Sequence, residues 1–448
     1  MTNIARLRQH GLFTARAPRY TSYPPATEFT AQIGADFQRN CLQSLAHDQP
    51  VSVYVHIPFC ERLCWFCACR TQGTRTLDPV ATYLRYIKQE LQRVGEALPK
   101  GIKMARLHWG GGTPTILSPA MIATLAKDIF QTFTPTDHFQ FSVEIDPTLV
   151  NVEKIATLAE FGMNRASIGI QDFAPKVQSA IGRNQSFATT RDCIDKLRAA
   201  GINSVNADLV YGLPYQGQAE LAQTVSLVDD LKPDRIALYG YAHVPQIAKR
   251  QHLIPENSLP DPVARFNLAQ FAAHELTARG YRSIGIDHFA MPNDALSKAS
   301  DEGLLHRNFQ GYTDEPCETL IGLGASSISQ FKEGYVQNAP ATAAYTQRIA
   351  NGDFAGMRGF ALTHDDRLRA RAINQLMCRF EIDDKEFDAN GQNSLCPIHA
   401  AVLRDFAGLV RYENGILKIV PEGRPLTRLI AQYYDAYAKG CDQFSQVS

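Results

Sequence analysis

The stretch Cys60-Glu-Arg-Leu-Cys-Trp-Phe-Cys-Ala-Cys69 holds four cysteines, spaced C-x3-C-x2-C-x-C. The run before it, residues 51–58, is rich in β-branched and aromatic residues and ends at a proline, which predicts a strand. The thiols therefore lie on a loop just past the carboxyl end of a strand. In parallel α/β proteins that is where active sites lie.

Three of these thiols, Cys60, Cys64 and Cys67, could hold iron, hold zinc or form a disulfide, because thiolates are soft ligands. If only three thiolates bind a [4Fe–4S] cube, one iron stays open to another ligand. Structural zinc normally takes four ligands, usually as two distant pairs, and no second Cys or His pair with that spacing follows. The spacing favours the open-site cluster, while zinc and a redox C-x-x-C (Cys64 and Cys67) stay open as alternatives.

The composition excludes several classes of protein. The 448 residues are 45% hydrophobic, and 45 Lys and Arg balance 45 Asp and Glu, which argues against general nucleic-acid binding. No apolar run of about 18 residues occurs, so no membrane span is expected. The first residues lack the apolar core of a signal peptide, and the ten cysteines are partly scattered, which together predict a cytoplasmic protein.

Strand and helix patterns alternate after the cysteine loop. Further strands are predicted at 104–109, 140–145, 165–170, 203–210 and 235–241, and helices near 79–98, 119–130, 151–161, 186–199 and 217–231. Such alternation indicates right-handed βαβ units around a parallel sheet. With the first strand, about six units are present, which fits a barrel or a partial barrel.

The flanking segments follow other patterns. Residues 17–25 are irregular and read as a surface arm, or as a lid because of their aromatic and Arg content. After a connection at 245–262, a helix is predicted at 262–279 and a strand at 281–287. Beyond 360 we expect helices at 363–378, near 397–408 and at 424–438, with a hairpin at 409–420 around Asn414-Gly415. This order resembles a winged-helix module. The helices carry few basic residues, however, which argues against DNA binding.

The triple glycine at 110–112 follows a predicted strand. Glycines let the backbone approach a ligand closely and leave N–H groups pointing outward. We therefore expect backbone groups there to be able to pair with the ammonium and carboxylate of an amino acid. The motif is not a dinucleotide fingerprint, because the G-x-G-x-x-G spacing is not met.

Polar residues recur in or at the ends of the later strands, namely Glu144, Asp146, Gln171, Asp172 and Asp208. Polar groups in apolar strands cost free energy unless they are paired, so several at one end of a sheet predict a polar cavity at the barrel mouth. Carboxylates there suit ribose hydroxyls and ammonium groups. Arg183 could grip a carboxylate through two hydrogen bonds. The donor-rich segment 306–313 is either an ordinary polar loop or a binding site for an anionic organic ligand.

Taken together, C-x3-C-x2-C after a strand and the later G-G-G-T-P resemble the radical S-adenosylmethionine (SAM) superfamily. The resemblance narrows to the oxygen-independent coproporphyrinogen III oxidases, and it is carried by Arg19–Pro24, Tyr54–Cys60, Cys69, Leu107–Pro114, Gly169–Phe173, Asp208–Pro214 and His306–Thr313. It covers nearly the whole chain. Haem chaperones and haem-utilisation proteins on the same frame are the alternative; the chaperone type typically lacks the fourth cysteine, so Cys69 and the 306–313 loop favour the oxidase.

The resemblance implies a fold and a division of the chain. It implies an α/β fold, a partial (β/α)6 radical SAM barrel with an N-terminal arm and a mostly helical, winged-helix-like C-terminal domain. The expected parts are an arm or lid at 1–48, the barrel at 49–290, a barrel extension with a substrate loop at 291–360, and a helical cap at 361–448.

The resemblance also implies one [4Fe–4S] cluster, with Cys60, Cys64 and Cys67 as ligands and Cys69 as a non-ligand, and two SAM molecules. The residues that match the first SAM site are Tyr54, Phe66, Gly111, Glu144 and Ile328. Those that match the second are Gly112, Thr113, Gln171, Arg183, Asp208 and Ala242. Arg19, Arg183, His306 and Arg307 are candidates for holding the substrate's carboxylates.

The implied reaction converts two propionates of coproporphyrinogen III to vinyl groups, giving protoporphyrinogen IX for haem biosynthesis. A radical derived from SAM starts each decarboxylation, so the arm and the 306–313 loop would close over the substrate and keep out water and oxygen. The expected partners are the substrate and a one-electron donor such as a flavodoxin or ferredoxin. The protein is expected to be a monomer, because one chain carries every part of the site.

Overall fold

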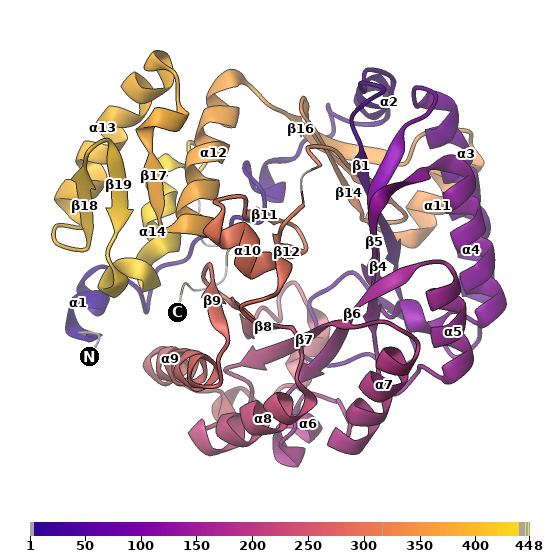
Figure 1. Cartoon of the computed structure of the whole chain (residues 1–448), viewed down its shortest axis with the longest axis horizontal. Coiled ribbons are helices and arrows are strands. Elements are labelled where there is room, and N and C mark those ends of the chain that lie inside the picture. Colours follow the sequence, from indigo (N-terminus) through magenta and orange to yellow (C-terminus); the bar gives the residue numbers. More distant parts are fainter. Residues whose placement is uncertain (1–3, 316, 439–443, 445–446, 448) are drawn as a thin grey trace.

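The computed structural model describes residues 4–315, 317–438, 444 and 447, and a twelve-stranded sheet lies at its centre (Figure 1). Six strands lie side by side in chain order and run parallel: β1 (Val51–Ile57), β4 (Lys103–Gly111), β5 (Thr134–Ile145), β6 (Met163–Gln171), β7 (Ser204–Tyr211) and β8 (Arg235–Gly240). β13 (Leu320–Leu323) joins the other side of β1, also parallel. The predicted partial barrel is confirmed.

Helices connect these strands and cover the outer face of the sheet, where they form an arc in Figure 1. They are α3 (Asp78–Ala97), α4 (Pro119–Thr132), α5 (Val152–Glu160), α6 (Pro175–Ala180), α7 (Phe187–Ala199), α8 (Gln218–Leu231) and α9 (Pro262–Ala278). Side-chain caps begin several of them, since Ser118, Asn151 and Ser186 each accept a hydrogen bond from a backbone N–H of the first turn.

The core lies between the helices and the sheet, because each of these elements buries a continuous apolar face. Val80, Ile87 and Leu91 of α3 recur at helical spacing and are buried. β1 buries both faces of the strand, as expected for a strand at the centre of a parallel sheet.

Antiparallel strands extend the sheet at both edges. β10 (His288–Ala290) pairs with β8 and with β9 (Arg282–Ile284), while β14 (Ile328–Phe331), β15 (Gly334–Asn338) and β16 (Gly356–Ala361) extend the edge beyond β13. The predicted single strand at 281–287 is therefore wrong. The chain turns at Gly285, where φ is +56° and an added Cβ would lie 2.0 Å from the Tyr312 ring, so only glycine fits.

Short elements join the larger ones. β2 (Phe59–Cys60) pairs with β3 (Gln72–Gly73), and β11 (His306–Asn308) pairs with β12 (Gly311–Thr313). The first pair joins the two ends of the cysteine loop. The second makes the donor-rich segment 306–313 a hairpin. The 245–262 connection contains the 3-10 turns η3 (Lys249–Leu253) and η4 (Glu256–Ser258), and α10 (Ala295–Asp301) and α11 (Thr342–Ala350) follow later.

The C-terminal part has α12 (His364–Arg379), α13 (Ala389–Asp405) and a three-stranded sheet of β17 (Glu381–Asp383), β19 (Ile416–Ile419) and β18 (Val410–Glu413). The predicted hairpin is confirmed, but two helix predictions were inaccurate. α13 begins at its Asp388 cap and continues through Pro397, which was expected to begin the helix. The predicted helix at 424–438 is reduced to α14 (Thr427–Ala431), because Pro421 and Pro425 keep the preceding residues in the 3-10 turn η6 (Pro421–Leu426); η7 (Gln432–Tyr434) follows.

The N-terminal residues are more ordered than a surface arm would be. They contain α1 (Ile4–Gln9), η1 (Ala26–Glu28) and α2 (Ala35–Gln43). Leu12, Tyr20 and Tyr23 are buried in one apolar core with residues of α12, α13 and α14. In Figure 1 α1 (indigo) lies beside the C-terminal elements (yellow). The arm up to Tyr23 is thus part of the C-terminal core, whereas Cys41 and Leu42 of α2 belong to the core of the barrel.

Within the part of the chain that the structure describes, no helix has both the length and the apolar character needed to cross a membrane.

Candidate active site at the mouth of the sheet

A cavity of about 530 Å³ lies inside the curved sheet and extends from near the amino ends of the parallel strands to the loops at their carboxyl ends. Most residues singled out from the sequence line it: Arg19, Cys60, Cys64, Phe66, Cys67, Cys69, Gly111, Gly112, Thr113, Glu144, Gln171, Arg183, Asp208 and Ala242. The polar cavity that the strand ends predicted is therefore present, and these residues come together in it. Tyr54, Ile328, His306 and Arg307 are not among its lining residues.

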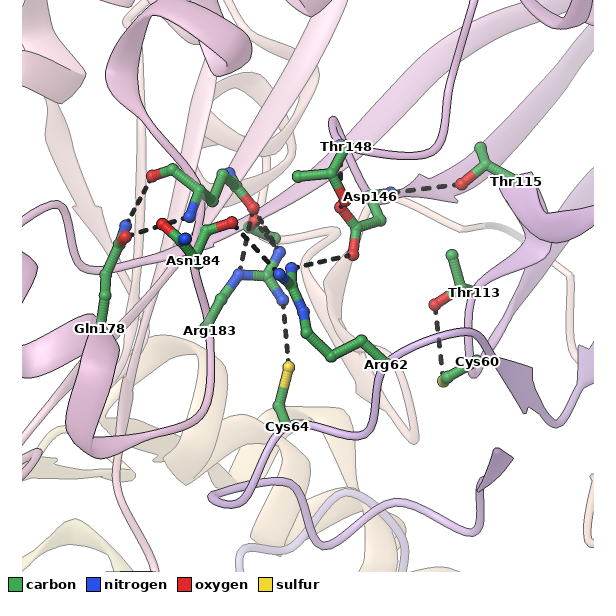
Figure 2. Close-up of polar contacts among 12 residues, drawn as sticks. Cys60, Arg62, Cys64, Thr113, Thr115, Asp146, Thr148, Gln178, Arg183 and Asn184 are labelled. Carbon is green, nitrogen blue, oxygen red and sulfur yellow. Dashed lines mark hydrogen bonds and ion pairs between the residues drawn. The ribbon is translucent and has the colours of Figure 1, made fainter. Parts of the chain in front are cut away.

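The cysteine loop forms one wall of this cavity. Cys60 is buried at the end of β2, Cys64 and Cys67 are half-buried, and Cys69 is exposed. The Thr113 hydroxyl donates to the Cys60 sulfur, and Arg183 Nη1 donates to the Cys64 sulfur, each at 3.5 Å (Figure 2). Both donors would stabilise thiolates, since hydrogen bonds and positive charge favour the ionised form.

The loop thiols differ in acidity. A hydrogen bond from Cys69 lowers the pKa of Cys67 to about 6, and the same pairing raises the pKa of Cys69 well above its usual value. Burial raises the pKa of Cys60 to about 11. Cys69 is thus hydrogen-bonded to Cys67, and its role as a non-ligand stays a prediction.

The donor set fits an iron–sulfur cube better than a single metal ion. Among the described residues, no three His, Cys, Asp or Glu side chains converge closely enough to hold one ion. Cys60, Cys64 and Cys67 nevertheless line one cavity wall. A cube binds each thiolate at a separate iron, so it takes ligands that are spread in this way, whereas zinc gathers four ligands around one centre.

The glycine turn at the end of β4 packs against the backbone that leads from β1 into the cysteine loop. An added Cβ on Gly112 would lie 2.7 Å from the carbonyl oxygens of Ile57 and Phe59, which leaves no room for a side chain. The Gly112 and Thr113 N–H groups donate to those same oxygens at 2.8 and 2.9 Å. The expectation that N–H groups here point toward a ligand is therefore wrong for these two: the turn uses them to hold the loop against the sheet.

Glu144 accepts a hydrogen bond from a third N–H group of this turn, that of Gly111. Its Oε2 accepts from the Gly111 N–H at 3.0 Å, and its Oε1 lies 3.4 Å from His108 Nε2. Burial opposes ionisation, but the hydrogen bond and charge of His108 together with the Gly111 N–H outweigh it and lower the pKa of Glu144. The site thus holds a carboxylate beside the glycine turn, suited to an ammonium or ribose hydroxyl.

Arg183 is held in place by oxygen atoms of its neighbours. It donates to the Gly169 carbonyl at 2.6 Å, and its Nε and Nη2 donate to Gln185 Oε1. Only Nη1 faces the cysteine loop, where it meets Cys64 (Figure 2). The same figure shows Arg62, which donates to the Asn184 carbonyl at 3.2 Å and lies 4.0 Å from Asp146. A two-pronged grip on a carboxylate by Arg183 would require it to leave Gln185.

Asp208 lies across the cavity from Glu144. Asn206 and Ser167 donate to its two oxygens at 2.8 and 3.0 Å. Burial and the charge of Glu144 nevertheless raise the pKa of Asp208 to about 6. The neighbouring Gln171 has a left-handed backbone, with φ of +70°.

The other residues matched to SAM sites are tied to this framework. Tyr54 shares a 3.0 Å hydrogen bond with His56 and stacks on His108, so it supports the partner of Glu144. The buried amide of Gln251 donates to the Phe66 and Ala242 carbonyls, at 2.8 and 3.1 Å, and so joins the cysteine loop to the segment after β8. Ile328 begins β14, at the sheet edge beyond β13.

Two of the four candidate substrate contacts lie outside this cavity. His306 and Arg307 line an adjoining cavity of about 650 Å³ together with Tyr20 and Tyr23 of the arm, so the arm and the 306–313 hairpin face one space. Arg307 is already engaged, because both its Nη groups bond to Asp287 (3.2 and 3.0 Å) and its guanidinium lies over Tyr312.

Sequence reasoning missed three arginines deep in the cavity. Arg106, Arg165 and Arg235 lie near the amino ends of β4, β6 and β8 and line it from below. Arg106 pairs with Asp314 at 3.0 Å and Arg235 with Asp294 at 2.7 Å. A signal was available for Arg106 and Arg165, whose strands bury largely alternate residues, but not for Arg235, because the first four residues of β8 are all buried.

Comparison with known proteins agrees with this geometry. Residues 54–228 match the Radical SAM superfamily, and residues 362–426 match the HemN C-terminal domain. The oxygen-independent coproporphyrinogen III oxidase of Cereibacter sphaeroides is 52% identical over 100% of both chains, and that of Paracoccus denitrificans is 48% identical over 98% of both. The solved structure of coproporphyrinogen III oxidase (HemN) from Escherichia coli, a radical SAM enzyme, is 35% identical, with a TM-score of 0.91 over 98% of this chain and 99% of that one. The chain therefore belongs to the oxygen-independent coproporphyrinogen III oxidase family of the radical SAM superfamily.

Proposed function

We propose that this chain decarboxylates two propionate side chains of coproporphyrinogen III to vinyl groups without oxygen, giving protoporphyrinogen IX in haem biosynthesis. The observation that carries the proposal is the C-x3-C-x2-C loop on the wall of the cavity at the carboxyl ends of the parallel strands, in a chain that matches its relatives over its whole length. A cytoplasmic location is part of the proposal.

In this proposal Cys60, Cys64 and Cys67 hold one [4Fe–4S] cluster. When bound, the cluster and SAM would supply a carbon radical able to take a hydrogen atom from the propionate β-carbon, so that loss of CO₂ and of one electron to an external acceptor would leave a vinyl group. Thr113 and Arg183 stabilise two of the ligand thiolates. A flavodoxin or ferredoxin is the proposed electron donor, and the monomer is the proposed active form.

The cavity offers two regions for SAM, and we include two molecules in the proposal. Glu144 beside the glycine turn supports the first, with its low pKa and its fixed oxygens. Gln171 and Asp208 on β6 and β7, together with Arg183 in the loop between α6 and α7, support the second. The arm and the 306–313 hairpin, which line one adjoining space, would exclude water from a reactive radical.

The test is anaerobic turnover. Purified protein with a reconstituted cluster is given SAM, a strong reductant and coproporphyrinogen III, and both 5′-deoxyadenosine and porphyrin products are measured. We expect protoporphyrin to form together with deoxyadenosine. Cys64→Ala should lose both products and iron, whereas Cys396→Ala, an exposed thiol on α13, should keep them. Deoxyadenosine without decarboxylated product would move the function toward haem chaperones or haem-utilisation proteins.

A further inference from the structure

A second cavity, of about 330 Å³, lies beside the main one, between β8, the start of α9, the arm and the C-terminal elements. Five arginines line it: Arg19, Arg265, Arg307, Arg424 and Arg428. Asp287 is the one carboxylate among the described residues that line it. We call these five residues the arginine cavity.

The single carboxylate is already neutralised. Asp287 forms an ion pair with Arg307 at 3.0 Å and also lies 2.7 Å from His288 Nδ1. These partners outweigh the effect of burial and hold the pKa of Asp287 far below its usual range. Three of the five guanidinium groups, those of Arg19, Arg265 and Arg424, therefore have no counter-charge among the described residues that line this cavity.

Arg265 supplies more hydrogen-bonding capacity than the protein uses. Its Nη1 donates to the Tyr241 carbonyl at 3.2 Å, while its Nε is buried without a hydrogen-bond partner among the described residues. The stem crosses Gly212 so closely that an added Cβ there would lie 2.8 Å from it. Arg265 is thus a half-buried cation with a buried Nε donor that is not satisfied, which is uncommon in native structures.

The other cations crowd the same space. Arg428 is 9% exposed and donates to the carbonyl oxygens of Pro18, Ala17 and Val447. Burial, together with the charges of Arg19 and Arg307, lowers the pKa of Arg428 to about 9. Arg19 donates to the Gly240 carbonyl at 3.0 Å. Like charges gathered in a low-dielectric space repel one another, and an anion among them would remove that repulsion.

The two cavities share a wall. Arg19 and the segment from Tyr239 to Ala242 line both, so one ligand can extend from the main cavity into the second.

We propose that the arginine cavity binds carboxylates of the tetrapyrrole substrate other than the one that reacts. The proposal rests on the proposed function, in which a tetracarboxylate is held while one propionate is treated at a time. Guanidinium groups bind carboxylates through paired, charge-assisted hydrogen bonds, which give orientation as well as affinity. The cavity would therefore set which propionate reaches the reaction centre.

The test measures binding without turnover. Coproporphyrin III, the stable oxidised form, is titrated into the cluster-loaded protein and its fluorescence is followed, for wild type, Arg265→Gln and Arg424→Gln. Arg424 is an exposed lining residue whose recorded contact is with the Phe380 ring. Arg411→Gln, an exposed residue on β18 outside the cavity, is the matched control. The tetramethyl ester of the same porphyrin is the uncharged probe.

We expect each cavity variant to weaken binding of the free acid about tenfold, because each removes a charge-assisted hydrogen bond. Arg411→Gln should bind like wild type, and the cavity variants should not change binding of the ester. Wild-type affinity in both cavity variants, or equal affinity of wild type for ester and acid, would overturn the proposal.

Iron content and deoxyadenosine release in the absence of substrate check that the variants are intact. If Arg265→Gln lacks iron, Arg424→Gln and Arg265→Lys decide the matter, with Lys keeping the charge. The proposed function fails separately: a wild type that binds the acid through these arginines but makes no protoporphyrin would keep the cavity assignment and lose the reaction.

Discussion

Glu90 offers a stringent test of how the sheet edge next to the site is held. This α3 carboxylate is 2% exposed and accepts three hydrogen bonds at 2.7 Å, from the Gly324 N–H, Asn338 Nδ2 and the Tyr345 hydroxyl. It thereby ties the turn between β13 and β14, the strand β15 and the helix α11 to the barrel. Ile328, one of the residues matched to a SAM site, begins the strand that follows this turn.

Glu90→Ala leaves three buried donors without their acceptor. At about 1–3 kcal/mol for each donor, with partial relaxation, the free energy of unfolding should fall by about 3–6 kcal/mol. Burial acts in the opposite direction, since it raises the pKa of Glu90 to about 7 from 4.5. Holding the ionised group thus costs roughly 3 kcal/mol, at 1.36 kcal/mol for each pKa unit.

The two effects separate with pH. A carboxyl whose folded pKa is raised stabilises the fold below its unfolded pKa, and this stability is lost as the pH rises through the folded pKa. The cost of Glu90→Ala should therefore be largest at about pH 5 and smaller by roughly 3 kcal/mol at about pH 8. Peptides covering 320–338 should lose protection first.

Urea unfolding, followed by tryptophan fluorescence at the two pH values, measures the difference, and hydrogen exchange of the 320–338 peptides localises it. Glu96→Ala, at an exposed position of the same helix, is the control and should change stability by less than about 0.5 kcal/mol. If Glu90→Ala lowers the free energy of unfolding by less than about 1 kcal/mol at pH 5, or by an amount independent of pH, this account of the Glu90 hydrogen bonds is refuted.

Three further predictions follow from single contacts. Gly112→Ala places a Cβ against two backbone carbonyls, so it should displace the cysteine loop and lower the iron bound per chain. Gly95→Ala on α3 is the control and should leave the iron content unchanged, because its Cβ would meet only the Thr132 side chain, at 3.2 Å. Arg307→Ala removes the guanidinium partner of the buried Asp287 and leaves it His288 Nδ1 at 2.7 Å, so it should cost about 3–5 kcal/mol in urea unfolding, with Asp287→Asn in the same chain restoring part of it. Asp208→Asn should abolish a pH dependence of stability. Because the pKa of Asp208 is raised in the folded state, the wild type should lose up to about 3 kcal/mol of unfolding free energy relative to the variant as pH rises from about 4 to 6. The same change of unfolding free energy with pH in both proteins would contradict this.

The sequence predicted what local pattern determines. β-branched strands ending at prolines or glycines and capped helices of regular period located the six parallel units, and cysteine spacing located the loop that faces their cavity. The strand at 281–287 was misjudged because its break at Gly285 depends on the ring of Tyr312, which lies far along the chain. The edge strands β14 to β16 are short and without clear period, so pairing rather than pattern defines them.

The same distinction applies to the site. Residue types and positions predicted that Glu144, Arg183 and Asp208 would share a cavity, but not what each already binds. Arg183 is engaged by Gln185 and Arg307 by Asp287, so neither is a ready partner for a carboxylate. Arginine identity alone does not report whether a guanidinium is occupied, because its partner often comes from a distant segment.

The burial of the arm changes how closure of the site should be understood. Tyr20 and Tyr23 lie in the apolar core of the C-terminal elements, and Tyr20 donates to Asp435 at 3.1 Å. Arg19, the residue just before them, reaches the Gly240 carbonyl at the end of β8. The arm is anchored in the C-terminal core and also contacts the barrel sheet. It can move only together with the C-terminal core, since breaking its buried contacts there would cost several kcal/mol. Opening of the cavity on this side therefore involves the C-terminal elements as a unit, rather than the arm alone.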